Sequence, residues 1–143
     1  MGFVMNIKIQ KNCGNINWNE VQNILKTVGM SYVDIDTHKI SFENSYTVIF
    51  VFDDNKLIGF GRAISDGVRN SSIYDVATLP EYQGKGIGRL IIENIIKNTP
   101  NCNFILYATP GKEGFYESLG FYKLKTGMGY FFDLERAKSK ELI

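Results

Sequence analysis

The stretch LPEYQGKGIGRLIIENIIKN, residues 79–98, joins a glycine-rich turn directly to an aliphatic helical pattern. Gly84, Gly86 and Gly88 stand at alternate positions, although glycine destabilises ordered backbone. The start of a helix carries unsatisfied N–H groups and a partial positive charge, and glycine removes the Cβ that would keep a ligand away. The turn therefore predicts a phosphate cradle, although a tight strand-to-helix turn without a ligand would show the same glycines.

The composition sets the broad class of the chain. With 143 residues, 44% hydrophobic and 22% charged, we expect one globular domain over residues 1–143. The net charge of +1 gives no global case for a nucleic-acid or anionic-membrane partner. Cys13 and Cys102 lack CxxC or Cys/His spacing, so no metal site is expected. Without a long apolar stretch or a leader pattern, the expectation is a cytoplasmic protein with no membrane span.

Periodicity and turn signals divide the chain into strands and helices. Short polar turns join the strands expected at 46–53, 56–65 and 71–79 into an antiparallel meander. The strand 71–79, a helix at 86–98 and a strand at 103–109 form one right-handed parallel crossover. The expected fold class is α/β, with a mixed, mostly antiparallel central sheet flanked by helices. The other expected elements are a strand at 5–10, helices at 18–29, 36–44 and 112–119, and a final strand pair at 121–126 and 129–134.

Two motifs together carry a resemblance to a known family. The phosphate-binding motif GxxxxGK[ST] is missing, and the dinucleotide motif GxGxxG would need glycine at Arg89. What remains, QGKGIG at 83–88, matches Q/R-x-x-G-x-G/A and resembles the acetyl-coenzyme A signature of the GNAT superfamily of N-acetyltransferases. The stretch GFYESLGF at 114–121 is similar to the C-terminal motif of that family. The resemblance implies a GNAT-like acyl-CoA N-acyltransferase fold and an enzyme that uses acetyl-CoA.

The resemblance also implies how the coenzyme is held. In the family, the loop amides bind the pyrophosphate without a metal, and the strands similar to 71–79 and 103–109 splay apart to admit the pantetheine arm. Lys85 and Arg89 would add positive charge, although either could be a solvated side chain. Many members carry an Asn and an Ala before the motif tyrosine, where this chain has Thr109 and Lys112. The implied coenzyme contacts are the backbone of Ala77, Thr78 and Leu79, the loop residues Gln83, Gly84, Lys85, Gly86, Ile87, Gly88 and Arg89, and Tyr116.

Tyr116 is the candidate general acid. A thiol has a reference pKa near 8.5 and tyrosine one near 10, so a phenol can donate a proton to the departing thiolate. In the family, the tyrosine at this motif position lies near the coenzyme sulfur. Taken alone, Tyr116 between Phe115 and Phe121 would be typical of a core aromatic residue.

Asp75 is the candidate base for the acceptor amine, acting directly or through water. Strand alternation predicts Asp75 on one face with Ile73 and Ala77, and the opposite face for Tyr74, Val76 and Thr78. The carboxylate could instead cap a loop or pair with Arg62 or Arg69. Both interpretations remain open from the sequence.

The expected reaction is transfer of the acetyl group from acetyl-CoA to a primary amine of a small molecule, or less readily of a protein or peptide. A coenzyme-binding regulatory module without turnover shares the same loop and is an alternative. The run YDVATLPEYQGKGIG at 74–88 also resembles amino-sugar phosphate N-acetyltransferases. The aromatic run GYFF at 129–132 either fills the core or supplies a homodimer contact, which is common in the family.

Overall fold

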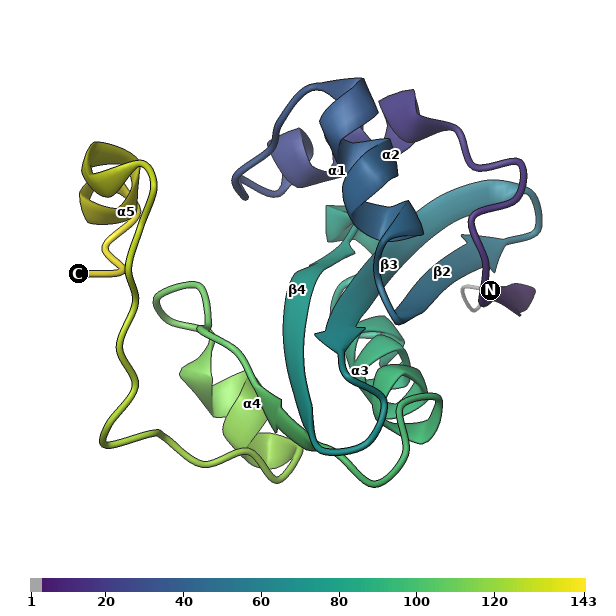
Figure 1. The fold of residues 1–143 in the computed structure, drawn as a ribbon. Coiled ribbons are helices and arrows are strands. Elements are labelled where there is room, and N and C mark those ends of the chain that lie inside the picture. The colour runs from purple at the N-terminus through teal and green to yellow at the C-terminus, as the bar shows by residue number, and fades with distance from the viewer. Residues whose placement is uncertain (1–3) are drawn as a thin grey trace. The chain divides into compact units, whose positions relative to one another are not determined.

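The computed structural model describes residues 4–143, and Figure 1 gives its ribbon. The chain divides into two compact units, one ending at Leu106 and the other covering Tyr107–Ile143. Each unit is described by itself below. One domain over residues 1–143 therefore stays a prediction, and residues 1–3 lie outside the described part.

A five-stranded sheet forms the centre of the first unit, with the strands in the order β1-β2-β3-β4-β5. Each neighbouring pair is antiparallel except β4 and β5, which are parallel. The expected meander, and the parallel pairing across the following helix, are therefore confirmed. The strands are β1 (Ile7–Gln10), β2 (Thr47–Asp53), β3 (Lys56–Ser65), β4 (Asn70–Thr78) and β5 (Asn103–Ile105).

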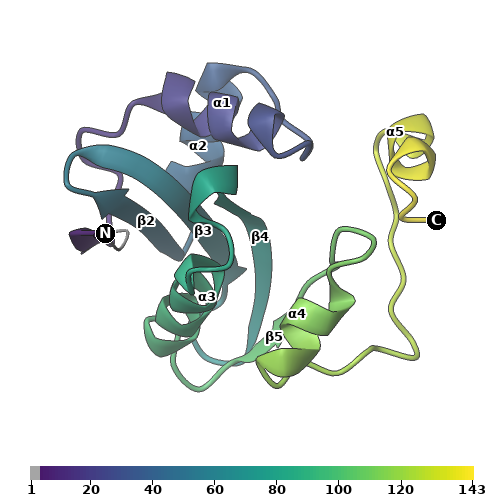
Figure 2. The same ribbon diagram turned by 180° about the vertical axis from the view of Figure 1, so that it is seen from behind.

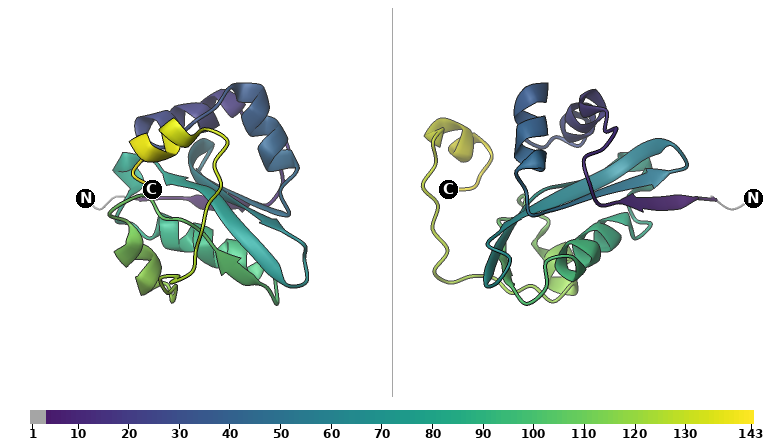
Figure 3. Two further views of the ribbon diagram at one scale, coloured as in Figure 1. Left: turned by 60° about the vertical axis from the view of Figure 1, so that its left-hand side comes forward. Right: turned by 45° about the vertical axis from the view of Figure 1, so that its right-hand side comes forward.

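Helices cover both faces of this sheet, as the edge-on view in Figure 3 shows. α1 (Trp18–Thr27) and α2 (Ile35–Glu43) lie on one face, and α3 (Ile87–Lys97) lies on the other. Asn17 and Asp34 cap the first two helices with their side chains, so the expected helix at 36–44 is confirmed with a defined start. The mixed, helix-flanked fold class predicted from the sequence is confirmed.

The core has one layer on each side of the sheet. Under α1 and α2, the rings of Phe42, Phe50 and Phe60 pack together and are fully buried. Under α3, Ile91 and Ile95 approach the sheet so closely that a Cβ on Gly61 would lie 2.8 Å from the first and 3.1 Å from the second. Burial of apolar side chains in both layers holds the helices onto the sheet.

A β-bulge interrupts β4 and makes the predicted alternation wrong. Phe60 pairs with Ala77, but Arg62 pairs with Tyr74, so two residues of β4 stand opposite Gly61 alone. The extra residue is Asp75, whose φ is +57°. An inserted residue resets the two-residue period of side chains, so Tyr74 and Ala77 face the α1/α2 layer together. Val76 faces α3 instead of sharing a face with Tyr74.

The second unit corrects the end of the predicted topology. Within residues 107–143, the structure has the helices α4 (Glu113–Ser118) and α5 (Leu134–Ser139), visible in Figure 2, and no strand. The strand pair predicted at 121–126 and 129–134 is therefore wrong, and the strand predicted at 103–109 ends at Ile105. Alternating apolar residues form a strand only where another strand accepts their backbone hydrogen bonds. Asp133 caps α5 by accepting from the Arg136 N–H.

Candidate active site

The glycine turn connects the end of β4 to the start of α3 through the short helix η1 (Pro80–Tyr82). Gly84 has φ of +75° and Gly86 has φ of +83°, in the left-handed region that glycine adopts without a Cβ penalty. A Cβ added at either position would meet no heavy atom within 4 Å. Glycine is therefore needed at these two positions for the left-handed backbone and not for close packing against a neighbour. The space in front of the turn is open.

The start of α3 offers backbone donors to that open space. Gly86 is the N-cap residue of α3 and provides no side-chain cap. The Leu90 N–H donates to the Gly86 carbonyl at 3.0 Å, so the N–H groups of Ile87, Gly88 and Arg89 precede this bond and have no partner inside the helix. Together with the partial positive charge of a helix N-terminus, these donors can hold an anion.

Side-chain hydrogen bonds fix the turn on its upstream side. Tyr82 is buried and its hydroxyl donates to Asp53 Oδ2 at 2.7 Å, which ties η1 to the end of β2. This hydrogen bond is the largest cause that raises the pKa of Tyr82 to about 12 and also the largest that lowers the pKa of Asp53. Gln83 Nε2 donates to the Thr78 carbonyl at 3.0 Å, so the first residue of the motif is held against the end of β4.

The basic side chains of the turn differ in their surroundings. Arg89 pairs with Glu93 one turn further along α3, with 3.2 Å between Nη1 and Oε1. Both side chains are more than half exposed, so the pair is screened by solvent and contributes little to stability. Lys85 is exposed on the turn itself. An anion at the turn would therefore meet backbone donors first and side-chain charge second.

The far half of β4 presents a backbone edge. Pairing of β4 with β5 covers only Asn70–Ser72 among the residues that the structure describes. The Leu79 N–H donates to the Ile58 carbonyl at 2.8 Å, so it faces β3. Because backbone groups alternate sides along a strand, Ala77 also faces β3 and Thr78 directs its N–H away from it. The predicted coenzyme contacts of these three residues stay predictions, and only Thr78 points its donor outward.

Asp75 forms an ion pair inside the α1/α2 layer. Its Oδ2 lies 2.7 Å from Arg62 Nε, and the two side chains are 21% and 13% exposed. The guanidinium also donates to Ser45 Oγ at 3.3 Å. It lies 5.7 Å from the ring centroid of Phe42 and 5.2 Å from that of Tyr74, which is cation–π distance. Of the structural alternatives for Asp75, the structure has the pairing with Arg62, and its role as a base stays a prediction.

His38 is a buried titratable group of α2 to which none of the sequence motifs points. It is 3% exposed, and its Nε2 accepts a hydrogen bond from the Val33 N–H at 3.0 Å. Burial is the largest cause that lowers the pKa of this imidazole below its ordinary value. A histidine four residues after the Asp34 cap is the one sequence signal for this inward position. Its contacts give it a structural role between α2 and the preceding loop.

Tyr116 belongs to α4 in the second unit. Its ring centroid lies 5.0 Å from that of Phe115 and 5.7 Å from that of Phe121, both edge-on. Burial raises the pKa of the phenol, so it is protonated at neutral pH. Immediately before α4, the Lys112 N–H donates to the Thr109 carbonyl at 2.9 Å in a turn. The role of Tyr116 as an acid stays a prediction.

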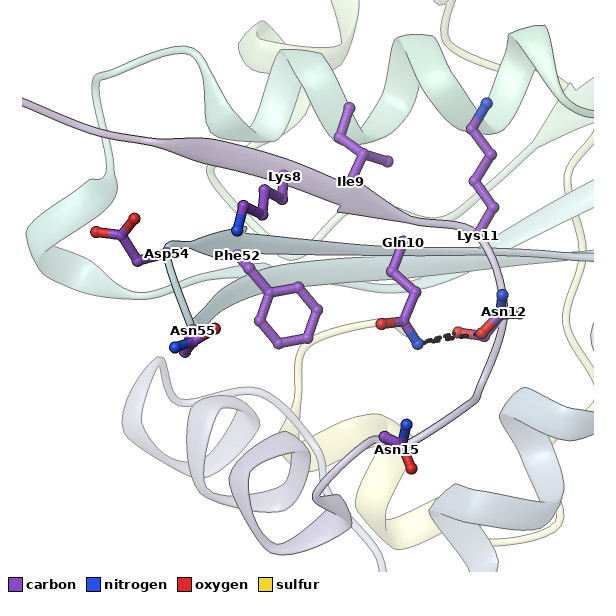
Figure 4. Close-up of a pocket in the computed structure, with 9 residues that line it drawn as sticks. All are labelled: Lys8, Ile9, Gln10, Lys11, Asn12, Asn15, Phe52, Asp54 and Asn55. Atoms are coloured by element: carbon purple, nitrogen blue, oxygen red, sulfur yellow. Dashed lines mark hydrogen bonds between the residues drawn. The ribbon is translucent and has the colours of Figure 1, made fainter.

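A pocket elsewhere in the first unit contains none of the predicted site residues. Figure 4 shows it between β1, the turn after β2 and the segment that leads to α1. Lys8 and Gln10 line it from β1, and the Phe52 ring lies between Asn55 and Gln10 in the view. Gln10 Nε2 donates to the Asn12 carbonyl at 2.8 Å, so these two lining residues are bonded to each other. Among residues 4–143, no group of three His, Cys, Asp or Glu side chains could hold a metal, and no helix is long and apolar enough to cross a bilayer.

The open turn with its helix amides after β4, together with the β4 edge beyond the pairing with β5, is the arrangement expected of a coenzyme A-dependent acyltransferase. The family model "Acetyltransferase (GNAT) domain" matches residues 19–128. The chain belongs to this family and is an acetyltransferase, an enzyme whose family uses acetyl-CoA and amine substrates.

Relatives and solved structures agree with this family. An uncharacterized N-acetyltransferase ycf52 of Pyropia yezoensis is 33% identical over 121 residues, which cover 80% of this chain and 70% of the relative. The probable acetyltransferase SA2161 of methicillin-resistant Staphylococcus aureus has a TM-score of 0.77 at 26% identity, with 90% of this chain and 98% of that one covered. Glucosamine-6-phosphate N-acetyltransferase of Arabidopsis thaliana, at 16% identity and a TM-score of 0.65 over 90% and 99% of the chains, shares the fold.

Proposed function

We propose that this chain transfers the acetyl group of acetyl-CoA directly to a primary amine of a small molecule, with both substrates bound at once. The observation that carries the proposal is the turn between β4 and α3. Its two left-handed glycines leave open space, and the helix amides behind them have no partner inside the helix. The coenzyme's pyrophosphate is an anion that such donors hold without a metal.

The strand that leads to the turn supplies the next part of the site. A pantetheine arm that leaves the turn along β4 meets the outward N–H of Thr78, which alternates with the inward N–H of Leu79. An N–H aimed at a thioester carbonyl stabilises the negative charge that develops on its oxygen during attack. This arrangement favours acyl transfer over simple anion binding.

Direct transfer then needs two proton movements. An alkylamine has a pKa of about 10.4, so it must lose a proton before its nitrogen bonds to the thioester carbon. As that bond forms, the bond from carbon to sulfur breaks, and the departing thiolate takes a proton. We assign Tyr116 as the donor because it stands at the tyrosine position of the stretch GFYESLGF, which resembles the family motif. Burial raises the pKa of the phenol, so Tyr116 carries the proton to be donated at neutral pH.

The test combines coenzyme binding with a panel of acceptors. Calorimetry measures the affinity for CoA, and thiol release measures turnover of acetyl-CoA with primary alkylamines, aminoglycosides, an amino-sugar phosphate and short peptides. Reactions without an amine give the background hydrolysis. The expected result is CoA binding together with thiol release that depends on a small amine and yields its acetylated product.

Two other outcomes would overturn the proposal in different ways. Binding of CoA without turnover across the panel would indicate a regulatory module. Turnover only with peptides would keep the acetyl donor but replace the acceptor class. Turnover only with the amino-sugar phosphate would agree with the proposal and narrow the acceptor to that kind of small molecule.

A further inference from the structure

The bulge on β4 combines two unusual residues at one point of the sheet. Asp75 has φ of +57°, a conformation that costs a non-glycine residue about 1–2 kcal/mol and that aspartate tolerates better than most. Opposite it stands Gly61, whose place has no room for a side chain because a Cβ would lie 2.8 Å from Ile91 Cγ2. The bulge is therefore specified from both strands.

Arg62 is the residue that contacts the bulge most directly. It follows Gly61 on β3, pairs in register with Tyr74, and reaches past it to bond the Asp75 carboxylate at 2.7 Å. Ser45 and the two flanking aromatic rings hold the guanidinium in this position. The contact ties the side chain of the left-handed residue Asp75 to the α1/α2 face.

The bulge decides what the following residues present. Beyond the bulge, the backbone N–H groups of Ala77 and Leu79 point toward β3, and that of Thr78 points toward the open edge. The hydrogen bond from the Leu79 N–H to the Ile58 carbonyl fixes this pattern. If the extra residue of β4 were lost from its pairing with β3, the backbone groups on one side of the bulge would exchange their directions, toward β3 and toward the open edge. The pairing of β4 with β5 stops at Ser72, shortly before it. The left-handed residue thus sets which amides the β4 edge offers.

We propose that Asp75 serves the reaction through its left-handed backbone rather than as a base, and that Arg62 is the positioning residue that holds this conformation. The proposal rests on the proposed function in one respect: the β4 edge must be where the coenzyme arm binds. In this proposal the Asp75 carboxylate pairs with Arg62 and takes no proton from the substrate amine.

The test is a double-mutant cycle that exploits the freedom of glycine. Asp75→Gly removes the carboxylate but adopts positive φ without a Cβ penalty, so we expect the Kd for CoA to stay within about twofold. Arg62→Met keeps the apolar contacts but loses the clamp, and should raise that Kd about fivefold, the equivalent of one weakened hydrogen bond. In the double variant Arg62→Met/Asp75→Gly, the Arg62 change should have no further effect. A purely structural role for Arg62 would give the same loss in both backgrounds.

Asp75→Val supplies the opposite case, because a β-branched residue resists positive φ. It should raise the Kd for CoA about tenfold. Asp54→Val is the matched control, since Asp54 has φ of +52° in the turn between β2 and β3, away from the β4 edge. It should lower the urea midpoint similarly and leave the Kd unchanged.

The outcomes separate this proposal from the proposed function. A loss of turnover in Asp75→Gly with unchanged CoA affinity would identify Asp75 as a base and overturn the proposal. Equal Kd values for the glycine and valine variants would also overturn it. If the wild-type chain bound no CoA, the proposed function and the role of Asp75 in the reaction would both fail. The urea midpoints would then still test the backbone conformation alone: a higher midpoint for Asp75→Gly than for Asp75→Val would support the left-handed residue, and equal midpoints would refute it.

Discussion

Replacement of Gly86 by valine tests the cradle most directly, because its effects on folding and on binding can be calculated separately. Gly86 has φ of +83°, and a Cβ there meets no heavy atom within 4 Å. The folding cost is therefore backbone strain alone, about 1–2 kcal/mol. For a chain of this size such a loss lowers Tm by about 3–8 °C.

The cost to coenzyme binding should be larger. The valine side chain would occupy the space in front of the α3 amides and displace the pyrophosphate from at least one charge-assisted hydrogen bond, worth about 1.5–3 kcal/mol. The Kd for CoA should then rise about 10- to 150-fold. Calorimetry on the folded variant measures this change, and differential scanning calorimetry measures Tm.

Gly29 provides the matched control for this experiment. It follows α1 with φ of +76°, and a Cβ there also meets no heavy atom within 4 Å. Gly29→Val should therefore lose a similar amount of stability while keeping its affinity for CoA. If Gly86→Val weakened CoA binding no more than Gly29→Val does, the turn would be only a strand-to-helix connection, and the cradle would have to be abandoned.

Three further changes test other parts of the structure. Tyr116→Phe should reduce turnover about 10²- to 10⁴-fold, the range for loss of a general acid, with CoA affinity kept; unchanged turnover would remove Tyr116 from the mechanism. His38 has a lowered pKa, so the unfolded chain binds its proton more readily: its contribution to stability is full above about pH 6.5 and is lost as the pH falls through the folded pKa. Urea midpoints at about pH 7.5 and about pH 5.5 should therefore differ more in the wild-type chain than in His38→Gln. Gly61→Ala should cost about 1–3 kcal/mol in urea unfolding, because its Cβ would overlap Ile91 in a packed layer, and an unchanged midpoint would contradict that packing.

Most of the first unit could be predicted from local signals. Helix caps at Asn17 and Asp34, polar turns between strands and the apolar spacing of α3 are short-range features, and the structure confirms the elements they indicate. The glycine turn was predictable for the same reason, since positive φ at Gly84 and Gly86 is a demand of the local backbone.

The bulge at Asp75 could not be predicted in this way. Ile73 and Ala77 are both apolar, so the sequence pattern is the same whether they lie on one face of the sheet or on opposite faces. An inserted residue between them therefore leaves no mark on the hydrophobic pattern. Its determinants are the lack of space at Gly61, which α3 imposes, and the ion pair with Arg62 on a different strand. Both are contacts between residues distant in sequence.

The C-terminal strand pair failed for a related reason. The consecutive aromatic residues Tyr130, Phe131 and Phe132 have high strand propensity, but a strand also needs a partner, which a single segment cannot specify. The local signal that does apply is a helix cap: Asp133 stands three residues before Arg136, accepts a hydrogen bond from its N–H, and begins a helix.

The hydrogen bond from Tyr82 to Asp53 has a kinetic consequence for the turn that follows it. Because η1 is tied to β2 at 2.7 Å and Gln83 is held by Thr78, the backbone donors are in place before any ligand arrives. A preorganised site loses little chain entropy on binding and needs no loop-closing step. The observed association rate of CoA should therefore rise linearly with its concentration, and Tyr82→Phe should introduce a plateau as ordering of the turn becomes limiting.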